Sequence, residues 1–294
     1  MQRATRIPIA GVHVPVYHVS DTSSTLDLAA TLLSDTTTAT PHLTTIIADR
    51  QSAGRGRLGR TWTTPDGQAL LASTIVSLPT SFPTEMLGWL VHACALSVRD
   101  ALSTRLAPLG HTVSLKWPND VLVDGARKVC GILAQLAPAS SPFTTSAILG
   151  YGINIAQDAN HLATPQATSL YVEGDTEAGA DPAAVSHTLL AQILAGLDSR
   201  IRGLVTHGDA RNCGLADEAA NALPLLGTRI ALAKPTDPDG HPAMEGIALG
   251  LSPTGSLLVR TDDGRTHDIN AGDVLATGIP LTTVHDTKEK RANN

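Results

Sequence analysis

A short stretch rich in glycine and arginine constrains this chain more than any other feature. Between Asp49 and Trp62 the sequence has four arginines and three glycines, directly after the mostly apolar residues 45–48. Glycine lets the backbone turn sharply and approach a ligand closely, and arginine offers forked donors that suit phosphate and carboxylate oxygens. The stretch therefore predicts a loop that covers an anionic small molecule. A solvated basic turn explains the same residues equally well, and the rest of the chain has to decide.

Charge and composition limit the classes of protein to which the chain can belong. The formal net charge is −6, so the cationic stretch is local, and a general nucleic-acid binder is disfavoured. With 294 residues, 42% of them hydrophobic and 16% charged, we expect a folded protein with one large domain and one small domain. We expect no membrane span and no secretory signal. Three widely spaced cysteines without a CxxC pair favour a reducing, cytoplasmic location.

Short strands and helices of mixed order are predicted over the first part of the chain. The strands are expected at residues 12–19, 44–48, 69–78, 113–116, 121–123, 128–136 and 146–155. Helices are expected from about Thr25 and over residues 85–106 and 183–205, and a Pro/Ser-rich loop over 138–142. Pro15 predicts an edge position for the first strand, and Asp124-Gly125 predicts a hairpin. This order indicates an α+β fold with a mixed or antiparallel central sheet flanked by helices.

The character of the chain changes after about residue 224. Four short strands are predicted at residues 228–233, 244–251, 256–261 and 266–269, separated by clusters of Gly, Pro and Asp. Regular short strands with such turns are typical of a small antiparallel barrel. We therefore expect a catalytic or binding domain over residues 1–223, a small barrel over 224–282, and a charged, disordered tail over 283–294.

Ser24 and Thr25 stand at the start of the first expected helix, inside a cluster of capping residues. Either residue could cap that helix. A helix start with hydroxyls and free N–H groups could equally bind a polar ligand. The two interpretations stay open at this point.

Four motifs in a fixed order now stand together. They are residues 54–60 (GRGRLGR), 116–120 (KWPND), 128–133 (KVCGIL) and 150–154 (GYGIN). With these motifs the chain resembles the biotin protein ligases over roughly residues 16 to 280. The resemblance implies a class II synthetase-like biotin/lipoate ligase domain, followed by an SH3-like barrel. It also implies a reaction in two steps, in which biotin and ATP give biotinyl-5′-AMP, and a carrier lysine then takes the biotin. No protein nucleophile is needed for this chemistry.

The resemblance assigns roles to individual residues. Lys128 and Arg57 are implied as the catalytic pair that offsets charge on the carboxylate and phosphate. Asp120 is implied as a ligand of Mg²⁺, although it could instead cap the hairpin. The implied biotin-binding residues are Ser24, Thr25, Gln51, Gly54, Arg55, Gly56, Arg57, Trp62, Lys128 and Gly131. The implied ATP- and adenylate-binding residues are Arg55, Arg57, Arg60, Lys116, Asn119, Lys128 and Asn154.

Several positions depart from the family pattern. Leu26 stands where Asn is usual, Leu58 replaces a common basic residue, and Gln135 stands where Glu is frequent. Trp62 is expected to pack on the biotin channel, although ordinary core packing explains it equally well. Arg50 has no assigned role.

The resemblance further implies the partners of the reaction. They are ATP, biotin, Mg²⁺ and a biotin carboxyl carrier domain of an acyl-CoA carboxylase. Because the resemblance to the catalytic domain begins within about twenty residues of Met1, we expect a monofunctional ligase without a DNA-binding domain. A lipoate or octanoate ligase on the same fold, and a non-catalytic anion-binding module, are the alternatives.

Overall fold

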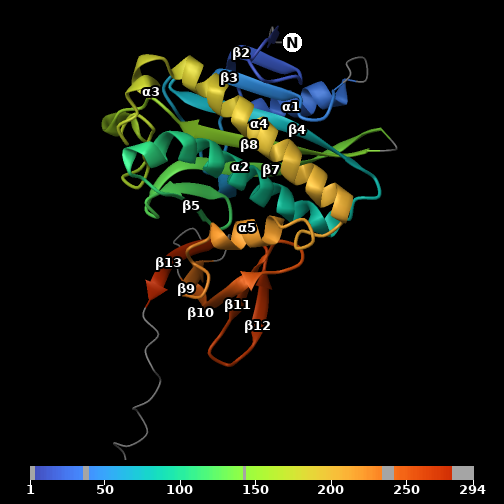
Figure 1. Ribbon diagram of the computed structural model, residues 1–294, viewed down its shortest axis with the longest axis vertical. Coiled ribbons are helices and arrows are strands. Elements are labelled where there is room, and N and C mark those ends of the chain that lie inside the picture. Colours follow the sequence, from blue (N-terminus) through green and yellow to red (C-terminus); the bar gives the residue numbers. More distant parts are fainter. Residues whose placement is uncertain (1–3, 36–39, 142–143, 234–241, 280–294) are drawn as a thin grey trace, which may run out of the picture. The chain divides into compact units, whose positions relative to one another are not determined.

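The computed structural model describes residues 4–35, 40–141, 144–233 and 242–279, and internal contacts divide the chain into two units (Figure 1). The first unit comprises Met1–Pro224 and Leu251–Ser256. The second comprises Leu225–Gly250 and Leu257–Asn294. Each unit contains one sheet, and each is described below by itself.

The first unit is built on an eight-stranded mixed sheet. The strand order is β1-β2-β3-β4-β8-β7-β6-β5, in which β2 and β3 are parallel and the other neighbours are antiparallel. The strands are β1 (Thr5–Ile7), β2 (Val16–Thr22), β3 (Thr45–Gln51), β4 (Ala69–Pro79), β5 (Val113–Lys116), β6 (Asp120–Val123), β7 (Arg127–Ser141) and β8 (Thr144–Asn154). The mixed sheet and its helices confirm the predicted α+β class.

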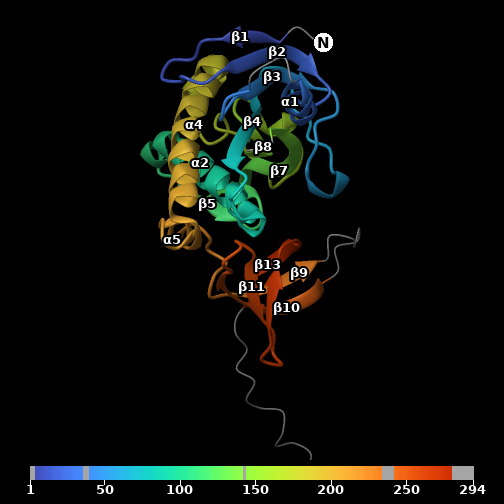
Figure 2. The ribbon, with the colours of Figure 1, turned by 90° about the vertical axis from the view of Figure 1, so that its right-hand side faces the viewer.

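Helices lie on both sides of this sheet, with α1 on one side and α2 and α4 on the other (Figure 2). The α-helices are α1 (Thr25–Ser34), α2 (Gly88–Leu106), α3 (Thr176–Ala180), α4 (Pro182–His207) and α5 (Leu215–Asn221). Single 3₁₀ turns are η1 (Arg57–Gly59), η2 (Thr84–Leu87), η3 (Ala107–Leu109) and η4 (Ala159–His161).

The packing of α1 determines which face of the sheet carries the site. Its buried residues Leu26, Ala29 and Leu33 form one cluster with buried isoleucines from β3, β4 and β8. Burying a leucine or isoleucine side chain stabilises a fold by roughly 1.5–3 kcal/mol, so this cluster fixes α1 firmly. The start of α1 therefore lies over the same sheet face as the ends of β3 and β8.

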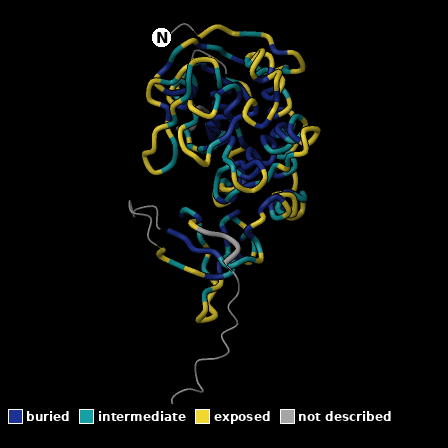
Figure 3. Tube along the Cα trace, turned by 90° about the vertical axis from the view of Figure 1, so that its left-hand side faces the viewer, coloured by how far each residue is buried: buried dark blue, intermediate teal, exposed yellow. Residues whose placement is uncertain are grey.

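The opposite face is covered by the two long helices. Most of α2 is buried, and α4 buries a stripe at helical spacing. Asp181 caps the start of α4, because its carboxylate accepts a hydrogen bond from Ala184 N at 3.0 Å. Gly208, with a φ of 65°, caps the end of the helix. Buried residues concentrate in the interior of this unit (Figure 3).

Two expectations for the first unit are wrong, and two short helices were missed. The strand after Pro15 is not an edge strand, because β1 pairs with it on the outside. Residues 138–141 belong to β7 rather than to a loop, and the pairing of β7 with β8 is irregular between Ala137 and Ser141. The short helices α3 and α5 were not predicted.

The second unit contains a five-stranded antiparallel sheet of order β12-β11-β10-β9-β13. Its strands are β9 (Arg229–Ala233), β10 (Pro242–Leu251), β11 (Leu257–Arg260), β12 (Thr266–Ile269) and β13 (Asp273–Ile279). Four of these were predicted, whereas β13 was not. The described strands form an open sheet rather than a closed barrel. The tail expected over residues 283–294 lies outside the described residues.

Candidate active site

One end of the site is a hydrogen-bonded polar cluster at the start of α1. The Oε1 atom of Gln51 accepts from Thr25 N at 2.8 Å and from Thr25 Oγ1 at 3.0 Å. Ser73 on β4 donates from Oγ to Thr25 Oγ1 at 2.8 Å. Ser24 occupies the N-cap position, but its buried hydroxyl makes no capping hydrogen bond. Capping therefore does not explain Ser24.

Ser73 was not identified from the sequence. It is fully buried in the mostly apolar strand β4, and its partner Thr25 is 48 residues away in the chain. The only signal for Ser73 in the sequence was a hydroxyl-bearing residue within this strand. In the structure, that position lies on the side of the sheet that α1 covers.

The middle of the site is a floor of glycines, on which Trp62 lies. Gly131 and Gly152 are directly paired across β7 and β8. A Cβ atom on Gly152 would lie 2.6 Å from Trp62 Cε2, and one on Gly131 would lie 3.1 Å from Trp62 Cζ3. Any side chain at Gly152 would therefore displace the indole. The Trp62 Nε1–H group is buried and has no hydrogen-bond partner among the described residues.

The arginine loop closes on itself above this floor. Trp62 N donates to Gly54 O at 2.9 Å, and Gly56 N donates to Arg60 O at 2.6 Å. A Cβ atom on Gly54 would lie 2.3 Å from Trp62 O and 3.0 Å from Gln51 Nε2. Glycine at position 54 thus brings the loop against both the polar cluster and the indole.

The three family departures occupy a core position, a loop position and a strand position. Leu26 is a core residue packed against Gly150, where an added Cβ would lie 2.9 Å from Leu26 Cδ2. Leu58 is 45% exposed at the tip of the arginine loop, with a φ of 59°. Gln135 on β7 is half-buried and pairs with Ile148.

Two arginines near the loop are tethered by surface carboxylates. Arg55 Nη2 lies 2.5 Å from Asp27 Oδ1 on α1. Arg50 Nε lies 2.8 Å from Asp21 Oδ1 on β2. Arg50 therefore has a structural partner, and the Arg55 pair ties the loop to α1.

The other end of the site is charged. Lys128 Nζ lies 2.6 Å from Asp120 Oδ1 and 5.7 Å from the Trp62 ring centroid. Arg57 Nη1 donates to Asn119 Oδ1 at 3.3 Å, and Asn119 Nδ2 donates to Ile132 O at 2.7 Å. The hairpin β6–β7 therefore brings three of the sequence motifs together at the edge of the glycine floor.

Asn154 ends β8, two residues after Gly152. It is 6% exposed, its Nδ2 donates to Thr168 O at 2.9 Å, and its Oδ1 accepts from Gln157 Nε2 at 3.0 Å. These bonds fix the orientation of the amide. Lys116 ends β5 opposite Asp120, and Arg60 is exposed on the loop.

The buried thiols do not supply a nucleophile. Burial raises the pKa of Cys94 to about 12 and raises the pKa of Cys130 well above its ordinary value. Because the thiolate is the reactive form, both side chains are inert.

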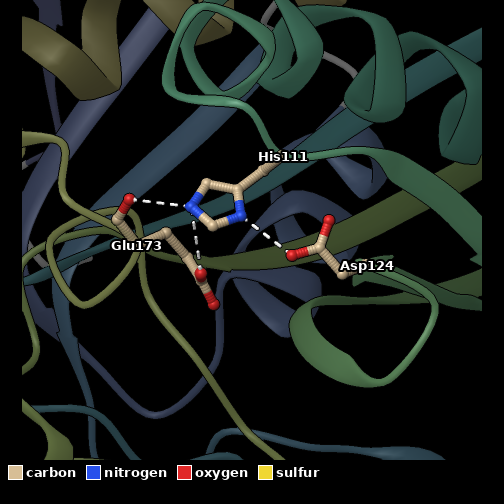
Figure 4. A group of neighbouring side chains, drawn as sticks. All are labelled: His111, Asp124 and Glu173. Carbon is tan, nitrogen blue, oxygen red and sulfur yellow. Dashed lines mark hydrogen bonds and ion pairs between the residues drawn. The ribbon is translucent and has the colours of Figure 1, made fainter.

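A second charged group lies beside the hairpin, formed by His111, Asp124 and Glu173 (Figure 4). These are donor types that bind metals, but the guanidinium of Arg127 already lies 2.6 Å from Glu173 and 2.7 Å from Asp124. Hydrogen bonds from the Thr112 backbone and from His111 hold the pKa of Asp124 well below its usual range. Arg127 thus supplies the cation that these carboxylates require, and we assign no metal to the group.

The arrangement of the site defines a class of enzyme. A polar cluster, an indole packed on glycines and a cationic end follow one another along the sheet. This order suits a ligand with a neutral polar head, an apolar chain and a terminal carboxylate, activated beside a phosphate. The fold and site are therefore those of a ligase that activates a carboxylic acid.

Comparisons with known proteins identify the family. Residues 20–154 match the biotin/lipoate A/B protein ligase family, and residues 236–275 match the biotin protein ligase C terminal domain. The biotin–[acetyl-CoA-carboxylase] ligase of Mycobacterium tuberculosis is 34% identical over 78% of this chain and 77% of the relative. That of Paracoccus denitrificans is 33% identical over 75% and 85%. The chain belongs to the biotin protein ligases, which use ATP to activate biotin and attach it to protein.

A solved structure agrees with this assignment. The biotin protein ligase from Aquifex aeolicus in complex with biotin and ATP is 26% identical, has a TM-score of 0.60, and matches over 88% of this chain and 97% of that chain. Among the described residues, no helix is long and apolar enough to cross a membrane.

Proposed function

We propose that this protein converts biotin and ATP into biotinyl-5′-AMP and then transfers the biotin to a lysine of a biotin carboxyl carrier domain. The carboxylate oxygen of biotin attacks the α-phosphorus of ATP, and the bond to the β-phosphate breaks, so that pyrophosphate leaves. The carrier amine then attacks the carbonyl carbon, the bond to the phosphate oxygen breaks, and AMP leaves.

The observation that carries this proposal is the order of groups along the glycine floor. Thr25 and Gln51 can exchange hydrogen bonds with the ureido head, which both donates and accepts. The floor and the Trp62 indole suit the apolar chain. The buried indole N–H, without a partner among the described residues, is a donor that a bound ligand oxygen would satisfy.

The charged end is suited to the reacting groups. Lys128 and Arg57 can offset the negative charge that builds up between carboxylate and phosphate. Ser24, Gly54, Arg55, Gly56 and Gly131 complete the proposed biotin contacts. Arg60, Lys116, Asn119 and Asn154 complete the proposed nucleotide contacts.

Mg²⁺ fits the charged end as a companion of the ATP phosphates. Mg²⁺ is commonly held by one or two carboxylates together with phosphate oxygens, and Asp120 offers a carboxylate beside Lys128. When bound, the ion would neutralise phosphate charge. The chain's own part is then to orient Asp120 through the ion pair with Lys128.

The carrier and the location belong to the same proposal. The names of the two relatives above support the carrier domain of acetyl-CoA carboxylase as the acceptor. Three free cysteines support a reducing, cytoplasmic location. The expectation that the protein does not act on DNA remains a prediction, which a gel mobility-shift assay tests.

A single assay tests the activity. The purified protein is incubated with ATP labelled at the α-phosphate and with Mg²⁺, and separate samples receive biotin, lipoate, octanoate or no acid. We expect labelled acyl-AMP with biotin, transfer of biotin when carrier domain is added, and loss of activity when Mg²⁺ is chelated. Acyl-AMP with lipoate or octanoate alone would support the related ligases, and none with any acid would support a binding module.

A further inference from the structure

Glu173 is a buried carboxylate outside the proposed contacts of biotin and ATP. Its side chain is 4% exposed, and Arg127 binds it through two parallel bonds, Nε to Oε1 at 2.6 Å and Nη2 to Oε2 at 2.8 Å. Thr168 Oγ1 donates to Glu173 Oε1 at 2.6 Å. A buried charge with this many donors holds its neighbours in one arrangement.

Thr168 connects this carboxylate to the proposed site. Thr168 N donates to Lys128 O at 2.8 Å, and Lys128 N donates to Gln166 O at 2.7 Å. The carbonyl oxygen of Thr168 also accepts a hydrogen bond from Asn154 Nδ2 at 2.9 Å. Thr168 is fully buried, so these bonds do not compete with water.

We infer that Glu173 is a positioning residue, which sets Lys128 and Asn154 together through Thr168 and Arg127. Arg127 directly precedes Lys128 on β7. Thr168 N donates to the carbonyl oxygen of Lys128. Glu173 therefore restrains Lys128 from two directions, and it restrains the Asn154 amide through the Thr168 carbonyl. This inference rests on the roles proposed above for Lys128 and Asn154.

The surrounding charges support a fixed arrangement. Arg127 Nη2 also binds Asp124 Oδ2 at 2.7 Å, and His111 Nδ1 lies 2.8 Å from the same oxygen (Figure 4). His111 Nε2 lies 3.2 Å from Glu173 O. The network thus joins the β6–β7 hairpin, the segment before β5 and the segment after β8, which are remote from one another in sequence.

Substitutions at two positions test the inference. Glu173→Gln keeps the shape and removes the charge that orients Arg127. Thr168→Val keeps the volume and removes only the hydroxyl donor to Glu173. The matched control is Asp175→Asn, because Asp175 is also buried and also receives two bonds from an arginine, Arg105. Within the described part of the chain it makes no hydrogen bond to Lys128, Thr168 or Asn154.

The measurements separate positioning from general stability. Adenylation kinetics with varied biotin and varied ATP are recorded for each protein, at a temperature where denaturation curves show it folded. We expect Glu173→Gln and Thr168→Val each to lower kcat/KM for both substrates about tenfold or more, because small misplacements of reacting groups are costly. We expect the double variant to lose less than the product of the two single losses. Asp175→Asn should lower Tm and keep the kinetics of the unchanged protein.

The outcomes are distinct. If Glu173→Gln does not fold, Thr168→Val decides alone. Unchanged kinetics in the folded variants, or an equal loss in Asp175→Asn, would overturn the inference. The wild-type protein is assayed before any variant. If it makes no biotinyl-AMP, the proposed function is wrong, and this outcome is distinct from a failure of the inference about Glu173.

Discussion

The ammonium group of Lys128 is held between the Asp120 carboxylate, 2.6 Å away, and the Trp62 ring, whose centroid is 5.7 Å away. Both contacts keep the cation at the edge of the glycine floor, where we propose that the biotin carboxylate binds. We expect Lys128→Ala to slow adenylation by about a hundredfold or more, because a preorganised cation is removed. Pyrophosphate release measures the rate. Arg202→Ala, at a side chain that is 76% exposed, is the control and should leave the rate unchanged.

Arg57 on the arginine loop contacts Asn119, the residue before β6. Without this contact the loop should cover the intermediate less well. We expect Arg57→Gly to release biotinyl-AMP, so that lysines of an added unrelated protein become biotinylated. Streptavidin blotting measures this effect, with Arg50→Gly as the control for loss of a loop-flanking arginine. An unchanged background in Arg57→Gly would contradict the role of Arg57 in retention.

Gly152 has no space for a side chain, since an added Cβ would lie 2.6 Å from the Trp62 ring. Gly152→Ala should displace the indole and weaken biotin binding by about tenfold or more, which corresponds to roughly 1.4 kcal/mol. Isothermal titration calorimetry measures the affinity. Gly250→Ala, where an added Cβ meets nothing within 4 Å, is the matched control. Equal affinities in the two variants would mean that the floor does not contact biotin.

At the scale of elements, α1 shows how a departure from the family pattern is absorbed. Leu26 belongs to the apolar cluster under this helix and is 6% exposed. Leu26→Asn should lower the free energy of unfolding by about 3 kcal/mol, because it buries an amide and removes apolar contacts. Chemical denaturation measures the loss, and Leu136→Asn, at a side chain that is 61% exposed, should be nearly neutral. A gain in biotin affinity in Leu26→Asn would show that this position reaches the ligand.

The long elements were predictable because their patterns are local. The strand expected at 69–78 is β4, and the helix expected at 85–106 is η2 followed by α2. Short elements such as β1, α3 and α5 contain too few residues to show a periodic pattern. The strand β13 was also not predicted from its sequence. Their existence depends on partners elsewhere in the fold.

The site shows the same division between local and distant information. The motifs pointed to Lys128, Asp120 and the arginine loop, which the structure brings together. Ser73 and Glu173 were missed because their partners, Thr25 and Arg127, lie 48 and 46 residues away in the chain. Pairing between distant segments is what a single sequence does not disclose.

At the scale of the whole molecule, one buried histidine should make stability depend on pH. His92 on α2 is bonded to Gly255 O at 2.7 Å, in the segment 251–256 of the same unit. Burial lowers the pKa of His92, although the bond to Gly255 opposes this effect. The unfolded chain therefore takes up a proton as the pH falls below roughly 6.5, whereas the folded chain does not.

The expected consequence is a loss of stability on acidification. As the pH falls from 7.5 to 5.5, the contribution of His92 to the free energy of unfolding should decrease. Below the pKa of His92 in the unfolded chain, the decrease should reach up to about 1.4 kcal/mol for each pH unit. Urea denaturation at several pH values measures the free energy of unfolding. His92→Gln does not titrate and should lose less stability over this interval. Parallel curves for the two proteins would assign the pH dependence to other groups.

The glycine floor also limits how the enzyme could be redesigned for larger acids. Gly131 and Gly152 have no side chain to shorten, so no substitution at these two positions can create space. Extra volume on this side can come from Trp62, the bulky side chain that lies on both glycines. Engineering for bulkier biotin analogues should therefore begin with smaller residues at position 62, and leave the two strands below untouched.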